Sequence, residues 1–183
     1  MHHMPDEQFP DVSGFKYIPA FVSEPEEQAA LELFATMPFR SIKMRGQIAR
    51  RTVCCFGFDY LYTRRGVAPA EPMPPVLMRL RERVEALTAE SSEFNQAIVT
   101  SYPPGAGINW HHDAPVFGPT IVGVSFGSAA RLLLRLGDVV HRVALAPRSA
   151  YVLAGAARSE WSHRIAPVAS HRYSVTFRQL PTA

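Results

Sequence analysis

The sequence predicts a mostly β (α+β) fold, a sandwich or jelly roll supported by helices near the N-terminus. The first reason is a series of short, β-rich segments that follow one another from residue 95 onward, with turn residues between them. The second is Gly137-Asp138, which separates two of these segments and is typical of a two-residue hairpin. About seven or eight short strands without intervening helices indicate a sandwich or jelly roll. The segments are NQAIVTSY, TIVGVSFG, ARLLLRL, VVHRVAL, SAYVLAG, SHRIAPV and HRYSVTFR.

Two helices are expected in the first half of the chain. Ser23 and Glu26 have the spacing of a capping box, and the apolar residues after them recur at helical intervals up to Pro38. A second helix is expected after the proline-rich loop at 67–75. Its apolar stripe consists of Val76, Leu77, Leu80, Val84 and Leu87. Neither segment has the features of a cofactor site, so we expect both helices to support the core.

Length and composition place the chain among globular proteins. Its 183 residues fit one domain, residues 1–183, and hydrophobic residues make up 47% against 19% charged residues. No apolar stretch approaches the roughly 20 residues that a membrane helix needs, and the polar N-terminus lacks the apolar segment of a signal peptide. We therefore expect a cytoplasmic protein with no membrane partner. A monomer is the default expectation for this architecture.

Basic and aromatic residues are interleaved between Arg40 and Arg65. Cations bind phosphates and aromatic rings stack on bases, so this segment is either a nucleic-acid contact or an ordinary solvated face. The basic residues are Arg40, Lys43, Arg45, Arg50, Arg51, Arg64 and Arg65. The aromatic ones are Phe39, Phe56, Phe58, Tyr60 and Tyr62.

The motif His111-His112-Asp113 is the first candidate for a metal site. If this stretch is extended, side chains alternate, so His111 and Asp113 point one way and His112 the other. A third ligand must come from elsewhere in the β-rich half, which offers His141, His163 and His171. Two histidines and one carboxylate, with the other positions open, are the arrangement of non-haem Fe(II) oxygenases.

The last β-rich segment contains Arg172 and Arg178. An oxoacid that chelates iron through two open positions has a second carboxylate, which must be held in a partly buried place. An arginine does this best, because its planar fork matches a carboxylate and stays charged. Both arginines are therefore candidates for this contact.

On these motifs the chain resembles the AlkB-type 2-oxoglutarate/Fe(II) dioxygenases, over roughly residues 14–179. The matching segments are SYPPGAGINWHHD, TIVGVSFGS, RSAYVLAGAARSEWSHRI and RYSVTFR, in the family's order and at about its spacing. RRTVCCFGFDY is similar to a segment of the family's nucleotide-facing lid. The resemblance implies a double-stranded β-helix (jelly-roll) core at about 95–180 and a helical and lid part at about 14–94.

The resemblance also implies a set of site residues. The implied iron ligands are His111, Asp113 and His163. The implied 2-oxoglutarate contacts are Tyr102, Arg172, Ser174 and Arg178, of which Arg172 matches the arginine that holds the far carboxylate. The expected substrate contacts are Arg50, Arg51, Phe56, Arg158 and Trp161. Arg158 and Trp161 either line the pocket or support His163 by packing.

Three departures from the family bear on substrate recognition and cosubstrate binding. Ala114-Pro115 follow Asp113 where the repair enzyme has acidic residues that contact the damaged base. Thr100 replaces the asparagine of the family's Asn-x-Tyr, and Ser174 stands where the last-strand motif has asparagine. The iron chemistry is thus expected to be retained, whereas the manner of base recognition is left open.

The expected activity is that of a 2-oxoglutarate- and Fe(II)-dependent dioxygenase that uses O₂, with ascorbate added in vitro. Its expected substrates are modified bases in single-stranded DNA or tRNA, demethylated or hydroxylated after the base is flipped out or already unpaired. Three alternatives stay open: the same iron chemistry on protein side chains or a small molecule, a zinc hydrolase, and a non-catalytic nucleic-acid binding module.

Overall fold

The computed structural model describes residues 11–44, 47–61, 66–88 and 93–181. Its strands are β1 (Phe15–Ile18), β2 (Arg40–Met44), β3 (Gln47–Phe56), β4 (Phe58–Leu61), β5 (Gly66–Pro69), β6 (Gln96–Tyr102), β7 (Ile108–His111), β8 (Ile121–Gly127), β9 (Ala130–Leu136), β10 (Val139–Leu145), β11 (Ala150–Leu153), β12 (Ser162–Ile165) and β13 (Arg172–Arg178). Its helices are α1 (Glu24–Ala35), α2 (Pro75–Glu85), α3 (Gly155–Ser159) and a 3-10 turn at Pro115–Phe117.

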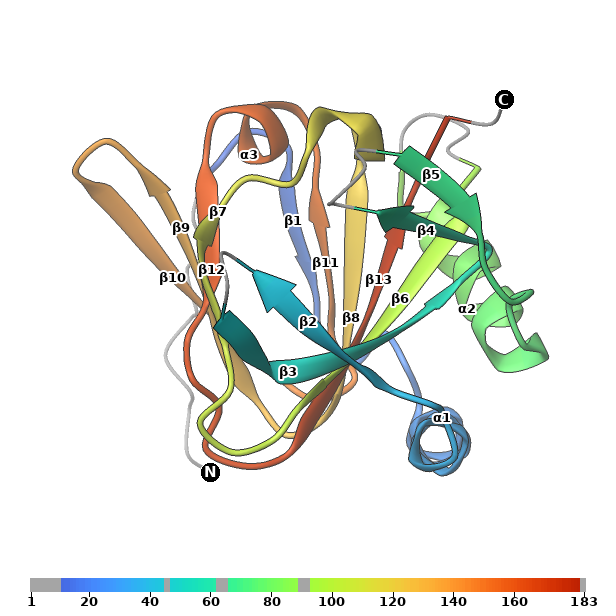
Figure 1. Cartoon of the computed structure of the whole chain (residues 1–183). Coiled ribbons are helices and arrows are strands. Elements are labelled where there is room, and N and C mark those ends of the chain that lie inside the picture. Colours follow the sequence, from blue (N-terminus) through green and yellow to red (C-terminus); the bar gives the residue numbers. More distant parts are fainter. Residues whose placement is uncertain (1–10, 45–46, 62–65, 89–92, 182–183) are drawn as a thin grey trace.

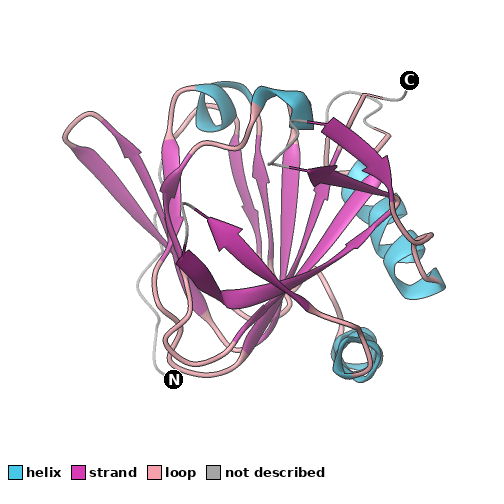
Figure 2. Ribbon diagram, in the orientation of Figure 1, coloured by secondary structure: helices cyan, strands magenta, loops and turns pink. Residues whose placement is uncertain are grey.

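Two antiparallel sheets form the body of the molecule (Figure 1). The larger sheet has seven strands in the order β1-β11-β8-β13-β6-β3-β2, and the smaller has four in the order β10-β9-β12-β7. β4 and β5 pair as a separate ribbon. Strands dominate the fold, with the helices at its periphery (Figure 2), so the mostly β fold expected from the sequence is confirmed.

Apolar side chains pack in two cores, one on each face of the larger sheet. The core between the sheets contains Leu132 and Leu134 of β9 together with Leu153 of β11. The second core lies between the larger sheet and the helices, and contains Val175 and Phe177 of β13. Because side chains alternate along a strand, the other residues of β13 face the space between the sheets. That strand is therefore apolar toward the helices and polar toward the interior.

Helix α1 begins as the sequence predicts. The Ser23 side chain accepts a hydrogen bond from the Glu26 backbone N–H, and the Glu26 carboxylate accepts one from the Ser23 N–H at 2.8 Å. The helix ends at Ala35, ahead of Pro38. Phe34 is fully buried and meets the Phe126 ring edge-on, with 5.3 Å between centroids. α1 is thereby packed against the larger sheet.

Helix α2 also lies where it is expected. Its buried residues are Leu77, Leu80 and Val84. Val76 is half-buried, and Leu87 follows the last helical residue by two positions while still packing on the same core. None of the described helices is long and apolar enough to span a membrane.

The second half of the chain follows the expected series of strands, with one correction. The hairpin between β9 and β10 closes at Gly137, whose φ is 58°, and pairs Leu136 with Val139. The expectation of no intervening helix is wrong, because α3 separates β11 from β12. Ala157 of this short helix is fully buried in the core between the sheets.

The part of the chain at 14–94 contributes strands as well as helices. β1 adds to one edge of the larger sheet, and β3 followed by β2 adds to the other. α1 and α2 cover the outer face of that sheet (Figure 1). The two parts of the chain therefore share both cores.

We expect Ser23→Ala to lower the free energy of unfolding by about 1 kcal/mol, because both hydrogen bonds of the Ser23 hydroxyl are lost. For a chain of this size that corresponds to a melting temperature lower by roughly 2–4 °C. Ser170→Ala, at an exposed turn, is the matched control and should stay within about 0.5 kcal/mol of the parent. Equal losses in the two variants would contradict the capping role.

Candidate metal centre

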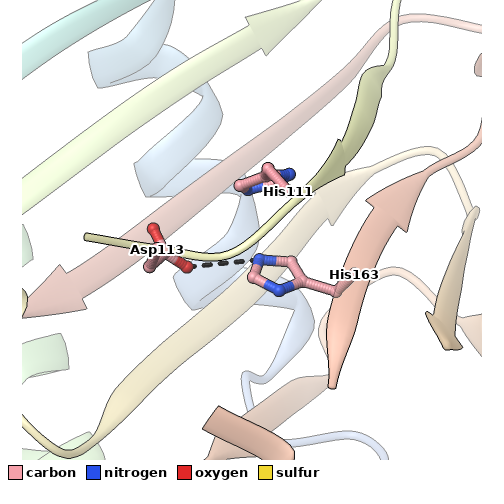
Figure 3. A group of neighbouring side chains, drawn as sticks. All are labelled: His111, Asp113 and His163. Atoms are coloured by element: carbon pink, nitrogen blue, oxygen red, sulfur yellow. Dashed lines mark ion pairs between the residues drawn. The ribbon is translucent and has the colours of Figure 1, made fainter. Parts of the chain in front are cut away.

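His111, Asp113 and His163 converge in the space between the sheets (Figure 3). Their ligand atoms all lie within 4.8 Å of one another. β7 ends at His111, which stands directly opposite His163 of β12, and the two rings are 4.2 Å apart between centroids. Asp113 lies two residues beyond the strand end, and its Oδ2 is 3.2 Å from His163 Nε2. The two segments thus meet at one point.

The other histidines that the structure describes, His112, His141 and His171, lie elsewhere. His112 is exposed and its Nε2 lies 3.4 Å from the backbone carbonyl of Glu160. The His141 ring packs on Trp161 at 5.3 Å, and His171 bonds with the Ser101 hydroxyl at 2.8 Å. Among the described residues, the group that could hold a metal ion is therefore His111, Asp113 and His163.

The charges of the centre favour metal binding. Burial alone would raise the pKa of Asp113, but the Arg178 guanidinium, 2.8 Å away, together with His163 holds that pKa well below its usual range. Burial, and then the nearby His163, lowers the pKa of His111 to about 4. Around neutral pH the carboxylate is therefore ionised and the His111 imidazole is neutral, which are the forms that bind metals.

A backbone contact orients the His111 ring. Its Nδ1–H donates to the Asn109 carbonyl at 2.8 Å. This fixes the tautomer and leaves the lone pair on Nε2 free for a metal. Two imidazole nitrogens and one carboxylate oxygen, gathered in a largely buried place, suit a divalent ion such as Fe(II).

Arg172 marks a second polar site in the same interior. It is 1% exposed, and its Nη2 donates to the Ser125 hydroxyl at 2.9 Å. Its Nε and Nη1 have no hydrogen-bond partner among the described residues, and its guanidinium lies 5.0 Å from the centre of the Tyr102 ring. A buried guanidinium with open donors is costly unless an anion meets it. The arrangement fits the carboxylate of a small ligand.

The expected cosubstrate residues share one face of the larger sheet. Ser174 is buried and lies in register with Ser125 of β8 and Thr100 of β6. Tyr102 stands opposite Arg172 in the same ladder. The structure therefore brings the predicted contacts together on the inner face, with Arg178 at the opposite end of β13, against Asp113.

Sequence reasoning missed Ser125 and Tyr151. Tyr151 faces the same interior, and burial, with a contribution from Tyr102, raises its pKa. Gly123 makes room for this ring, because a Cβ there would lie 2.4 Å from Tyr151 Cζ. Ser125, Tyr151 and Gly123 all occupy inward-facing positions of predicted strands, so strand alternation was the signal that could have found them.

Arg158 acts on the segment that contains Asp113. It is buried in α3, and its two terminal nitrogens donate to the backbone carbonyls of Asp113 at 2.9 Å and Ala114 at 2.8 Å. The expected support role thus falls on the Asp113 backbone. Trp161 is half-buried and contacts His141.

The other expected substrate contacts divide between two places. Arg51 donates to the Gly107 carbonyl at 3.4 Å, and Arg50 packs so close to Gly105 that a Cβ there would lie 2.7 Å from its Nη1. β2 and β3 thereby reach from the larger sheet toward β7 (Figure 1). Phe56 is paired with Ala97 of β6 and packs with it in the helix-side core instead.

Of the interleaved basic segment, the structure describes only part. Arg40 forms an ion pair with Asp59 at 2.5 Å, so one positive charge of the segment is compensated. Lys43 is exposed on β2. The positions outside the described residues are Arg45, Tyr62, Arg64 and Arg65.

Residues 14–178 match the 2OG-Fe(II) oxygenase superfamily. The chain is 33% identical over 114 residues to the probable RNA/DNA demethylase ALKBH6 of Danio rerio, covering 61% of this chain and 46% of that protein. It is 28% identical over 161 residues to the tRNA (carboxymethyluridine(34)-5-O)-methyltransferase ALKBH8 of Mus musculus, covering 84% and 24%. The chain thus spans less than half the length of these relatives.

Solved structures share the fold. The structure of OsALKBH1 superposes with a TM-score of 0.69 at 15% identity, covering 91% of this chain and 96% of that one. A prolyl hydroxylase of Trichoplax adhaerens, solved with a hypoxia inducible factor peptide, gives a TM-score of 0.67 at 15% identity, covering 91% and 83%. At this identity the likeness establishes the architecture alone.

We expect Arg158→Lys to weaken binding of Mn(II) or Fe(II) by roughly 10–100-fold, as loss of outer contacts to metal ligands does. Lysine keeps the charge but lacks the planar fork whose two terminal nitrogens each bond to one carbonyl, so the anchor on the Asp113 backbone is weakened. Anaerobic calorimetric titration of metal-free protein measures this, with Arg79→Lys on the exposed side of α2 as the control. Unchanged metal affinity in a folded Arg158→Lys variant would contradict the anchoring role.

Proposed function

The chain belongs to the 2OG-Fe(II) oxygenase superfamily, and on this premise we propose that it oxidises modified bases of DNA or RNA with Fe(II) and 2-oxoglutarate, acting as a monomer. The similarity to ALKBH6 and ALKBH8 confirms the AlkB-type resemblance of the sequence. The single observation that supports the chemistry best is the combination of a largely buried His-Asp-His group with a buried Arg172, two of whose nitrogens have no hydrogen-bond partner among the described residues, in one interior space.

The residues present fit both cofactors. His111, Asp113 and His163 would hold Fe(II), and Arg172 would hold the far carboxylate of 2-oxoglutarate beside Tyr102. When bound, Fe(II) and 2-oxoglutarate supply, with O₂, the power to oxidise a substrate C–H bond while 2-oxoglutarate becomes succinate. If the oxidised carbon is an N-methyl group, the product loses formaldehyde. An ordinary carbon stays hydroxylated.

The chain's own residues prepare this chemistry. Arg178 keeps the Asp113 carboxylate ionised and fixes its orientation from the side opposite His163. The Phe117 ring packs over the Arg178 guanidinium at 4.2 Å and limits its contact with water. Charges held in such a buried, fixed setting interact more strongly than they would in water.

Arg172 also distinguishes the proposal from a zinc hydrolase. A His-Asp-His zinc site would need a water and a general base, and it would leave two buried donors of Arg172 unexplained. A non-catalytic module would have no use for a buried cation of this kind, whose desolvation is costly. A bound dicarboxylate accounts for it.

The nucleic-acid substrate is supported by the relatives and by the lid. ALKBH6 and ALKBH8 are named for action on RNA, DNA or tRNA. In this chain β2 and β3 bring Arg50 and Arg51 to the loop that precedes β7. Cations at that place can bind phosphates next to a base that enters the interior. The second candidate, a protein or small-molecule substrate, is favoured by Ala114-Pro115, which provide no acidic contact to a base.

Incubation with Fe(II), ascorbate, 2-oxoglutarate, total tRNA and methylated single-stranded DNA tests the proposal. We expect loss of a methylated nucleoside, or gain of a hydroxylated one, measured by mass spectrometry. Asp113→Ala should abolish the change because one of the three ligands is removed. Conversion of 2-oxoglutarate to succinate with no altered nucleoside would contradict the nucleic-acid substrate and favour the second candidate.

Arg172→Gln is expected to raise the Kd of 2-oxoglutarate by about 10–100-fold, which is the loss of one or two charged hydrogen bonds. Binding of pyruvate, which has no second carboxylate, should stay unchanged, as should Mn(II) affinity. Calorimetry under anaerobic conditions measures all three, with Arg79→Gln as the control. Equal weakening of both oxoacids would show that Arg172 does not hold the far carboxylate.

A further inference from the structure

The smaller sheet has an outer face that the proposed site does not use. On β9, Leu132 and Leu134 pack into the core between the sheets. Because side chains alternate, Arg131, Leu133 and Arg135 project from the opposite, outer face. Both arginines are exposed.

Two neighbouring strands add arginines to this outer face. Leu133 is paired with Arg142 of β10 on one side and with Arg164 of β12 on the other. Directly paired residues share a face, so four arginines surround Leu133. Arg142 and Arg164 stand about 5 Å from it across the sheet, and Arg131 and Arg135 about 7 Å from it along the strand.

Trp110 extends the cluster to β7. The Arg135 guanidinium lies over the Trp110 ring, 4.3 Å from its centroid, by crossing β12 at the small Ser162. Stacking on an aromatic ring holds the charge in place without neutralising it. We call Trp110 and the four arginines the outer arginine face.

Among the residues that the structure describes, no acidic side chain compensates the charge of the outer arginine face. The strands β7, β9, β10 and β12 contain no Asp or Glu. Within the described part of the chain, none of the four arginines forms an ion pair, and Arg164 Nε is buried without a hydrogen-bond partner. Asp138 in the hairpin turn and Glu160 after α3 are exposed and pair with none of them. Clustered positive charge with an aromatic ring is the electrostatic footprint of a polyanion site.

We propose that the outer arginine face binds the phosphate backbone of a nucleic acid. This inference rests on the proposed function, because it supplies the second contact for the same substrate. β7 is the edge strand of the smaller sheet, and its consecutive residues Trp110 and His111 lie on the outer and inner faces. A nucleic acid with one base at His111 therefore reaches the outer arginine face by passing around the edge strand β7. Such contacts position the substrate and read no sequence.

Removal of two of these charges tests the proposal. The variant is Arg131→Gln with Arg142→Gln, and its matched control is Lys16→Gln with Arg79→Gln, which removes equal charge from exposed positions on β1 and α2. Binding of a labelled single-stranded DNA 30-mer and of tRNA is measured by fluorescence anisotropy from 50 mM to 300 mM NaCl. We expect the variant to bind roughly tenfold more weakly at 0.1 M salt, with a salt slope smaller by about 1.4 for the single strand.

A short substrate separates this proposal from the proposed function. A modified trinucleotide is too short to reach both faces, so its oxidation by the variant should equal that of the parent, whereas oxidation of long substrates should fall. Equal affinity and salt slope in variant, control and parent would overturn the proposal, as would a parent that binds no nucleic acid. If the variant instead alters self-association, measured by light scattering, the face is a contact between copies and the proposal falls.

The proposed function fails by a different result. In that case the parent converts 2-oxoglutarate but oxidises neither the trinucleotide nor tRNA. The outer arginine face would still stand if only the Arg131→Gln, Arg142→Gln variant lost tRNA binding. Thermal melting checks that both double variants are folded. We expect melting temperatures close to that of the parent, because all four substituted positions are exposed.

Discussion

The antiparallel pairing of β7 with β12 is the interaction on which the candidate site depends. It sets His111 opposite His163, and opposed residues on an antiparallel ladder point to the same face. Each strand has only four residues, and their pairing is irregular between His163 and Ile165. Support therefore comes from outside the pair: β9 pairs with the other edge of β12, and Arg158 holds the backbone after β7. A metal site built on so short a ladder needs both.

β13 carries site residues of the larger sheet, as β12 carries His163 in the smaller one. It lies between β8 and β6, and its apolar side chains pack under the helices while its polar ones face the interior. One strand thus joins the helix-packed core to the polar site around Arg172, and its neighbouring residues Phe177 and Arg178 lie in different environments. The capped helix α1 supports the site indirectly, because its Phe34 packs on Phe126 of the larger sheet.

Alternation also explains why one small sheet presents two chemically different faces. Its inner face presents imidazoles to a largely buried space, where a single charge pair such as Asp113 and Arg178 is strong. Its outer face presents arginines to water, where each charge is weak and screened by salt, so several are needed together. The two environments are separated by the thickness of one strand, so the imidazoles at the inner face lie close to the cations at the outer one.

The sequence by itself determined the local elements: the capping box of α1, the apolar stripe of α2, the hairpin at Gly137 and the alternating strands. These depend on neighbours along the chain. It also indicated the His-x-Asp pair, but the third ligand among three histidines was named only through the family resemblance. About fifty residues separate Asp113 from His163, and no local pattern specifies a strand register over that distance.

Tertiary structure alone decided which side chains share a space. It placed Phe56 on the helix side, inserted α3, and brought Ser125 and Tyr151 to the interior. It also aimed Arg158 at the Asp113 carbonyl and gathered arginines from three strands around Leu133. Each of these follows from pairings and packing between distant segments. The free energy that selects these arrangements comes from contacts across the whole folded protein rather than from any one stretch of sequence.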